Sequence, residues 1–194
     1  RLKVKDPVDE VQYLLKKGKI IAVKGLGGFH LVCDAMNQIA IKELRKRKRR
    51  PDKPLALMMK DEKIVKRYCY LNTKEEEVLT GIRKPILLLK CKFDQILPDI
   101  SPDNNYLGVM LPYTPLHEFL FNSDLKILVM TSANISGLPL EYTNKGALER
   151  LKNIADYFLL HNREIKVPVD DSISRIVLGK EQLIRRARGY APLG

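Results

Sequence analysis

The sequence contains no tryptophan and only three cysteines among its 194 residues, and these shortages exclude several classes of protein. Cys33, Cys69 and Cys91 form no CxxC pair, and they are too few for a disulfide framework. No apolar run approaches the roughly 20 residues that cross a bilayer, and the basic amino-terminus lacks the apolar core of a secretory signal. We therefore expect a cytoplasmic protein without a membrane partner. Because the sequence begins with Arg1, we also expect it to be a piece of a longer protein.

Common signatures of catalysis and nucleotide binding are also missing. The sequence has no GxxxxGK[ST] P-loop, and His30 stands where the dinucleotide fingerprint would need the third glycine after Gly25 and Gly27. No pair of histidines has zinc-ligand spacing, and no Ser/His/Asp or Cys/His catalytic set can be assembled. The Gly25–Gly28 segment is as compatible with a tight turn as with a phosphate-binding loop.

Positive charge is what the sequence has in excess, with 35 Lys and Arg against 23 Asp and Glu and a net charge of +12. Residues 42–53 carry a net charge of +6, and residues 180–188 carry +3. Such clusters attract the phosphates of a nucleotide or of a nucleic acid. A solvated helix face is the alternative for the first cluster. However, the cluster ends in a Pro-containing turn beside an apolar run, which favours a place in the lining of a site.

Hydrophobic periodicity predicts helices that alternate with strands. The predicted helices are one from Pro7 to before Gly18, one at 37–48, one at 61–67, one that a capping box starts at Thr73, one from Pro115, and one at 144–154. The predicted strands are 19–24, 54–60, 85–89, 107–111, 127–130, 157–160, 165–169, 173–178 and 183–188. This pattern indicates one α/β domain over residues 1–194, with a largely parallel or mixed sheet and helices on its faces.

The basic turn after residue 47 contains three candidate phosphate-binding cations. Two prolines restrict its backbone, so we expect Lys48, Arg50 and Lys53 to point in fixed directions. Preorganised cations are what phosphoryl or adenylyl chemistry needs, because charge develops on the phosphate oxygens.

A second polar segment, 131–137, directly follows a predicted buried strand. Ligands of α/β sheets gather beyond the carboxyl ends of strands, and hydroxyl and amide groups there can donate to phosphates. The candidate groups in this segment are Thr131, Ser132, Asn134 and Ser136. A hydrogen-bonded turn is the structural alternative.

A third segment contains two adjacent carboxylates. Asp170 and Asp171 are candidate Mg²⁺ ligands, because hard cations take carboxylate oxygens. A hairpin turn at these residues is the favoured alternative.

Three motifs in order resemble the YrdC/TsaC-like domain family: residues 48–55, 108–113 and 132–137. Four further segments are similar to the YrdC-like domain of the HypF carbamoyltransferases of [NiFe]-hydrogenase maturation: 23–35, 112–117, 169–172 and 185–192. The similarity extends from about residue 7 to residue 194. It implies a twisted, mixed and mostly parallel sheet with a basic concave cleft, and a place within a longer multidomain protein.

The resemblance also implies an activity and its partners. A HypF-like domain would form carbamoyl-adenylate and pyrophosphate from carbamate and ATP, with Mg²⁺. The small-molecule partners would be ATP and carbamate or carbamoyl phosphate, and a HypE-like protein would accept the carbamoyl group through the full-length parent.

The candidate residues suit this chemistry. Lys48, Arg50 and Lys53 would bind the triphosphate, and the polar segment with Thr131, Ser132, Asn134 and Ser136 would bind the α-phosphate or ribose. Arg186 or Arg188 would form a second cationic wall. Lys24 and His30 are candidates for the carbamate end because of their place beside the glycine turn.

Two alternative functions stay open. One is a threonylcarbamoyl-adenylate synthase for tRNA modification, although residues 21–26 lack the hydroxyl groups of the Pro-Thr-x-Thr-x-Tyr-Gly-Leu segment typical of those enzymes. The other is a non-catalytic module that binds double-stranded RNA or tRNA through backbone charge and shape. The low aromatic content of 7% argues against base stacking as its main binding mode.

Overall fold

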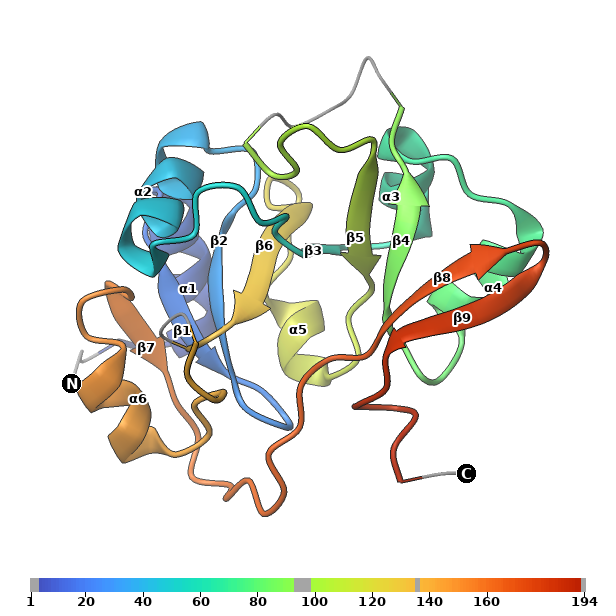
Figure 1. The fold of residues 1–194 in the computed structure, drawn as a ribbon. Helices are drawn as coiled ribbons and strands as arrows, with labels where there is room; N and C mark the ends of the chain where they lie inside the picture. The colour runs from blue at the N-terminus through green and yellow to red at the C-terminus, as the bar shows by residue number, and fades with distance from the viewer. Residues whose placement is uncertain (1–3, 93–98, 135–136, 193–194) are drawn as a thin grey trace.

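The computed structural model describes residues 4–92, 99–134 and 137–192 (Figure 1). The helices are α1 (Pro7–Lys16), α2 (Gln38–Lys48), α3 (Glu62–Tyr68), α4 (Thr73–Thr80), α5 (Pro115–Phe119) and α6 (Asn144–Arg150). The strands are β1 (Ile21–Lys24), β2 (Phe29–Asp34), β3 (Leu57–Met59), β4 (Ile86–Lys90), β5 (Tyr106–Met110), β6 (Ile127–Ser132), β7 (Tyr157–Leu159), β8 (Ile173–Val177) and β9 (Lys180–Arg185). None of the described helices is both long enough and apolar enough to cross a membrane.

The strands form one mixed sheet in the order β7-β1-β2-β6-β3-β5-β4-β8-β9. This confirms the α/β class with a mixed sheet, but the expectation of a mostly parallel sheet is wrong. Among the described strands, β1–β7, β3–β5 and β4–β8 are parallel, and the other five pairs are antiparallel. The turns at 25–28 and 178–179 are too short for a parallel crossover, so each joins an antiparallel pair.

Three local predictions need correction. The strand β2 was not predicted, because its first five residues are all buried and show no alternation of polar and apolar side chains. The capping box of α4 belongs to Asn72 and Glu75 rather than to Thr73. The predicted strand at 165–169 is absent, and this segment is part of an irregular crossover.

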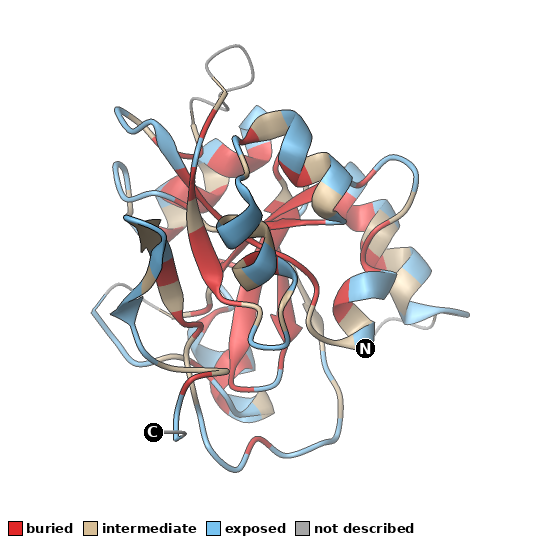
Figure 2. Cartoon of the chain, turned by 90° about the vertical axis from the view of Figure 1, so that its right-hand side faces the viewer, coloured by how far each residue is buried: buried red, intermediate tan, exposed pale blue. Residues whose placement is uncertain are grey.

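Helices cover both faces of the sheet, and the buried residues lie between these layers (Figure 2). Apolar side chains of α1 and residues just after α5 pack in one cluster with Val32, Leu128 and Met130. Apolar side chains of α2, α3, α4 and α6 pack in the other cluster, with Leu31 and Val129. Because successive strand residues point to opposite faces, each central strand contributes to both clusters.

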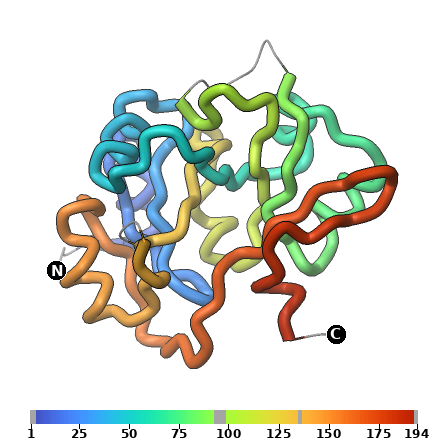
Figure 3. The backbone as a smooth tube through the Cα atoms, viewed as in Figure 1, coloured from blue at the N-terminus to red at the C-terminus, as the bar shows by residue number. Residues whose placement is uncertain are grey.

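The crossover of residues 160–172 joins β7 at one edge of the sheet to β8 near the opposite edge (Figure 3). Asp170 and Asp171 lie at its end. The prediction of a hairpin turn there is wrong, because residues 160–170 contain no strand and Asp171 instead forms a parallel bridge with Arg188. The crossover thereby brings two carboxylates to the centre of the molecule.

Candidate functional site

The basic turn begins where α2 ends. Arg49 has a left-handed backbone conformation, with φ of 52°. The Arg50 N–H donates to the Arg45 carbonyl at 3.0 Å and the Arg49 N–H to the Lys46 carbonyl at 3.1 Å, so the helix is closed by its own carbonyls. This termination directs the next residues away from the helix axis.

Lys48 is buried and holds the end of β6 and Asn134, which lies two residues beyond it. Its Nζ donates to the carbonyls of Ser132 at 2.8 Å and Asn134 at 3.0 Å, and to the Asn134 side-chain oxygen at 3.2 Å. Burial, and then the charge of Arg50, lower the pKa of Lys48 to about 8. Lys48, which was predicted to bind phosphate, therefore donates to protein oxygens in this structure and fixes the position of Ser132.

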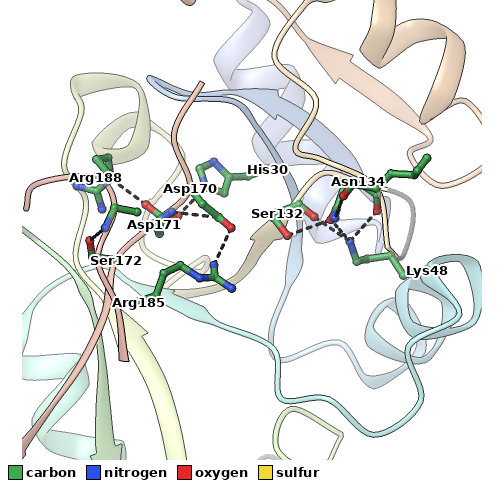
Figure 4. A network of polar contacts seen from close by, with 11 residues as sticks. His30, Lys48, Ser132, Asn134, Asp170, Asp171, Ser172, Arg185 and Arg188 are labelled. Carbon is green, nitrogen blue, oxygen red and sulfur yellow. Dashed lines mark hydrogen bonds and ion pairs between the residues drawn. The ribbon is translucent and has the colours of Figure 1, made fainter. Parts of the chain in front are cut away.

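A hollow of about 240 Å³ lies beside these residues. Its polar lining includes Arg50, Thr131, Ser132, Asp170, Asp171 and Arg185. Figure 4 labels Ser132, Asp170, Asp171 and Arg185 among them. Its floor is apolar and comes from β4, β5, β6 and β8, through residues Ile86, Leu88, Gly108, Met130 and Ile173. Five predicted residues, Arg50, Thr131, Ser132, Asp170 and Asp171, thus meet at one cavity, although they come from three distant parts of the sequence.

Two arginines supply the positive charge of this hollow. Arg185 donates to the Asp170 carboxylate at 2.6 Å, and Arg50 donates to the Pro54 carbonyl at 3.1 Å. Burial, followed by the charges of Arg45 and Arg185, lowers the pKa of Arg50, which shows that positive charge is crowded here. An anion in the hollow would relieve this repulsion.

A buried polar network is centred on Asp171, which also lines the hollow (Figure 4). One carboxylate oxygen is 2.9 Å from His30 Nε2, and the other accepts from Arg188 Nε at 2.8 Å. Burial alone would raise the pKa of Asp171, but His30 and Arg188 together hold it below its usual range. The Arg188 guanidinium also lies 3.5 Å from the Tyr113 ring centroid.

The two carboxylates do not fit a Mg²⁺ site in this structure. Both oxygens of Asp171 contact His30 or Arg188, and those of Asp170 accept from Arg185 and from the Asp171 backbone N–H. Within the described ranges, no group of three His, Cys, Asp or Glu side chains could hold a metal ion. We assign no metal ligand to them.

Other predicted site residues lie elsewhere. Lys24 is buried, and its Nζ donates to the carbonyls of His161 and Arg163 at 3.2 and 2.7 Å. Since Val23 pairs with His30 across the hairpin, Lys24 points to the opposite face from His30. Lys53 and Arg186 are exposed and do not line the hollow. Ser136 lies outside the described residues.

The remaining two candidates, Asn134 and Arg188, bind other protein groups and do not line the hollow. Asn134 accepts from Ser132 and Lys48 and donates to the Leu138 carbonyl at 2.7 Å, so it shapes its own loop. Arg188 belongs to the Asp171 network rather than to the lining.

Sequence reasoning missed two arginines. Arg185 lines the hollow, whereas its neighbours Arg186 and Arg188 were chosen. The basic run alone does not distinguish them, because the face that each residue takes depends on how β9 pairs with β8. Arg45 was counted only as part of the cluster, yet it is buried. The sequence does not show which of the eight basic residues of 42–53 is buried, because all of them carry the same charge.

Comparisons with known proteins identify the family of the chain. The sequence model of the Sua5/YciO/YrdC family, described as telomere recombination, matches residues 13–187. Carbamoyltransferase HypF of Synechocystis sp. is 51% identical over 179 residues, which cover 92% of this chain and 23% of that protein. A putative threonylcarbamoyl-AMP synthase of Methanocaldococcus jannaschii is 28% identical over 121 residues, covering 62% of this chain and 56% of that protein.

A solved HypF structure is also similar to this chain. Full-length HypF in the phosphate- and nucleotide-bound form matches with a TM-score of 0.91 and 47% identity, over 95% of this chain and 29% of that one. The chain therefore spans about a quarter of the length of the carbamoyltransferases that it matches.

Proposed function

The chain belongs to the Sua5/YciO/YrdC family, and from this premise we propose that it forms carbamoyl-adenylate from carbamate and ATP with release of pyrophosphate. The observation that carries the proposal is the hollow in which Arg50 and Arg185 face the hydroxyls of Thr131 and Ser132. The high identity to HypF carbamoyltransferases supports carbamate as the acyl substrate. Onward transfer to a HypE-like acceptor belongs to the longer protein and stays a prediction from the resemblance.

The proposed chemistry needs no general base. A carbamate oxygen attacks the α-phosphorus of ATP, and a new P–O bond forms as the bond to the bridging oxygen of the β-phosphate breaks. Pyrophosphate leaves with that electron pair. Because carbamate is already anionic, the protein has to bring two anions together, offset their repulsion and exclude water from the mixed anhydride.

The lining of the hollow suits these tasks. Arg50 and Arg185 would neutralise the phosphate oxygens, and Ser132 and Thr131 would donate hydrogen bonds without adding charge. His30 stays our candidate for the carbamate end, because it is anchored by Asp171 beside the same hollow. The apolar floor would keep water away from the anhydride.

The first test is ATP-induced stabilisation of the folded protein. ATP at about 100 times its Kd should raise the melting temperature by about 5–10 °C. Arg50→Ala and Arg185→Ala should each remove most of this rise, whereas Arg186→Ala, the adjacent control, should keep it. An equal effect of Arg185→Ala and Arg186→Ala would remove the hollow from the nucleotide site.

The second test identifies the product. With ATP, Mg²⁺ and carbamate, mass spectrometry should detect carbamoyl-adenylate, and pyrophosphate should accumulate. Pyrophosphate release that depends on threonine and bicarbonate would instead assign the chain to the threonylcarbamoyl branch, to which it has 28% identity. Ile21, Ala22 and Val23 are fully buried apolar residues where that branch carries hydroxyl groups, so we expect no threonine dependence.

A further inference from the structure

We infer that Arg45 is the positioning residue of this site, which aims Arg50 at the nucleotide phosphates by holding the basic turn around its own guanidinium. The inference rests on the proposed function. Arg45 does not line the hollow, so it acts through the backbone of the residues that do.

The basic turn is folded around one nitrogen of Arg45. Its Nη1 lies 2.9, 2.8 and 3.0 Å from the carbonyl oxygens of Arg50, Pro51 and Lys53. The Arg50 N–H in turn donates to the Arg45 carbonyl at 3.0 Å. Arg50 is therefore held by Arg45 through both its N–H and its carbonyl, which fixes the backbone position from which its side chain extends.

The same guanidinium also binds a second segment, residues 99–100. Nε donates to the Asp99 carbonyl at 2.8 Å, and Nη2 donates to the Ile100 carbonyl at 3.2 Å. The Ile100 carbonyl also accepts from the N–H of Leu55 at 2.9 Å, and Leu55 lines the hollow. One side chain thus ties together two segments that lie about 50 residues apart in the sequence.

Only an arginine can make this set of contacts. A guanidinium offers five N–H donors in a planar fork, whereas a lysine offers three donors from a single point. The five acceptors of Arg45 are all neutral backbone carbonyls. Within the described part of the chain, no carboxylate oxygen contacts Arg45, so its charge still adds to the positive potential of the hollow.

The neighbouring Arg47 provides a matched control on the same helix. It contacts Glu43 at 2.7 Å, Asp156 at 2.8 Å and the Ile154 carbonyl at 2.9 Å, none of which belongs to the basic turn. Arg47→Lys therefore loses comparable hydrogen bonds without freeing Arg50. Arg45→Lys keeps the charge but frees the turn.

The experiment is a double-mutant cycle on ATP affinity, measured by calorimetry well below each variant's melting temperature. Arg45→Lys should weaken ATP binding at least about 10-fold, as expected for a lost charge-assisted contact, and Arg47→Lys should leave it within 2-fold. Arg50→Ala should then cost much less in the Arg45→Lys background than in the wild type. In the Arg47→Lys background it should retain its full effect.

The outcomes separate three cases. A lower melting temperature for Arg45→Lys with unchanged ATP affinity, or a full additional loss from Arg50→Ala, would reduce Arg45 to a structural role and overturn the inference. Failure of the wild-type protein to bind ATP would overturn the proposed function itself. Should Arg45→Lys not fold, Arg45→Gln, which keeps two donors, is the variant for the same cycle.

Discussion

Asp170 and Asp171 are neighbours in the sequence, but they lie in opposite surroundings. The Asp171 side chain is 6% exposed and contacts His30 and a nearly buried Arg188, whereas the Asp170 side chain is 39% exposed and contacts an exposed Arg185. Removing one partner of a buried pair leaves the other charge without compensation, which an exposed pair does not. The stabilities of variants at these two positions should therefore differ.

We predict that Asp171→Asn lowers the free energy of unfolding by about 3–5 kcal/mol. The matched variant Asp170→Asn should change it by no more than about 1 kcal/mol. Urea denaturation at pH 7 measures both. Similar losses for the two variants would show that the Asp171 network does not stabilise the fold.

Lys48 should make nucleotide binding depend on pH in the alkaline range. Its pKa of about 8 in the folded protein is below the ordinary 10.5, so its ammonium loses the proton as pH rises through 8. ATP affinity should then fall between pH 7 and 9.5, because a positive charge next to Ser132 is lost and the Ser132 backbone loses an ionic hydrogen-bond donor. The Lys48→Met variant should bind ATP more weakly at pH 7, and its ATP affinity should not fall between pH 7 and 9.5.

The exposed Lys46 on the same helix is the control, since the ATP affinity of Lys46→Met should still fall. Stability should respond with the opposite sign. Between pH 8 and 10.5 the unfolded chain binds the proton that folded Lys48 has released, so this group's contribution to the free energy of unfolding rises with pH there. If the ATP affinity of Lys48→Met still falls near pH 8, the titrating group is not Lys48.

At the scale of elements, the turn between β1 and β2 packs closely against the backbone of the 160–172 crossover. A Cβ on Gly27 would lie 2.2 Å from the Val169 carbonyl oxygen, and the Val169 N–H donates to the Gly27 carbonyl at 3.0 Å. This contact fixes the backbone two residues before Asp171. The glycine turn is thus explained by packing, and its role is to position the Asp171 network.

We predict that Gly27→Ala lowers stability by about 1–3 kcal/mol, because the added methyl group must displace backbone atoms. Leu26→Ala, at an exposed position of the same turn, should change stability by no more than about 0.5 kcal/mol. Thermal denaturation compares the two. Equal melting temperatures for Gly27→Ala and wild type would mean that the crossover adapts without cost.

At the scale of the whole molecule, the net charge of +12 fits either a nucleotide site or a nucleic-acid surface, and salt separates the two. The affinity of a protein that contacts 6–10 phosphates of a nucleic-acid backbone falls by a factor of roughly 10³–10⁵ between 50 and 200 mM salt. Charges that are partly buried are screened less. We predict that ATP binding falls only modestly at 200 mM salt, while RNA binding becomes negligible. Tight RNA binding at 200 mM salt would favour the RNA-binding alternative.

Much of the local structure could be predicted from the sequence. Asp6 with Pro7 and Thr114 with Pro115 start α1 and α5 as their capping chemistry indicates, because a cap involves only groups within three residues of it. The basic turn and the family resemblance were likewise readable, since both are properties of short contiguous segments.

The partners of each side chain, in contrast, were decided by the tertiary structure. Lys48 bonds to carbonyls 84 and 86 residues away, and His30 meets Asp171 across 141 residues. The face that Arg185 takes depends on the pairing of β9 with β8, and the antiparallel majority of the sheet depends on which strands become neighbours. The sequence by itself determined which charges the molecule carries and where most of its elements begin. Only the packing of distant segments determined which of those charges hold the backbone and which face the hollow, because burial and hydrogen bonding are properties of neighbours in space.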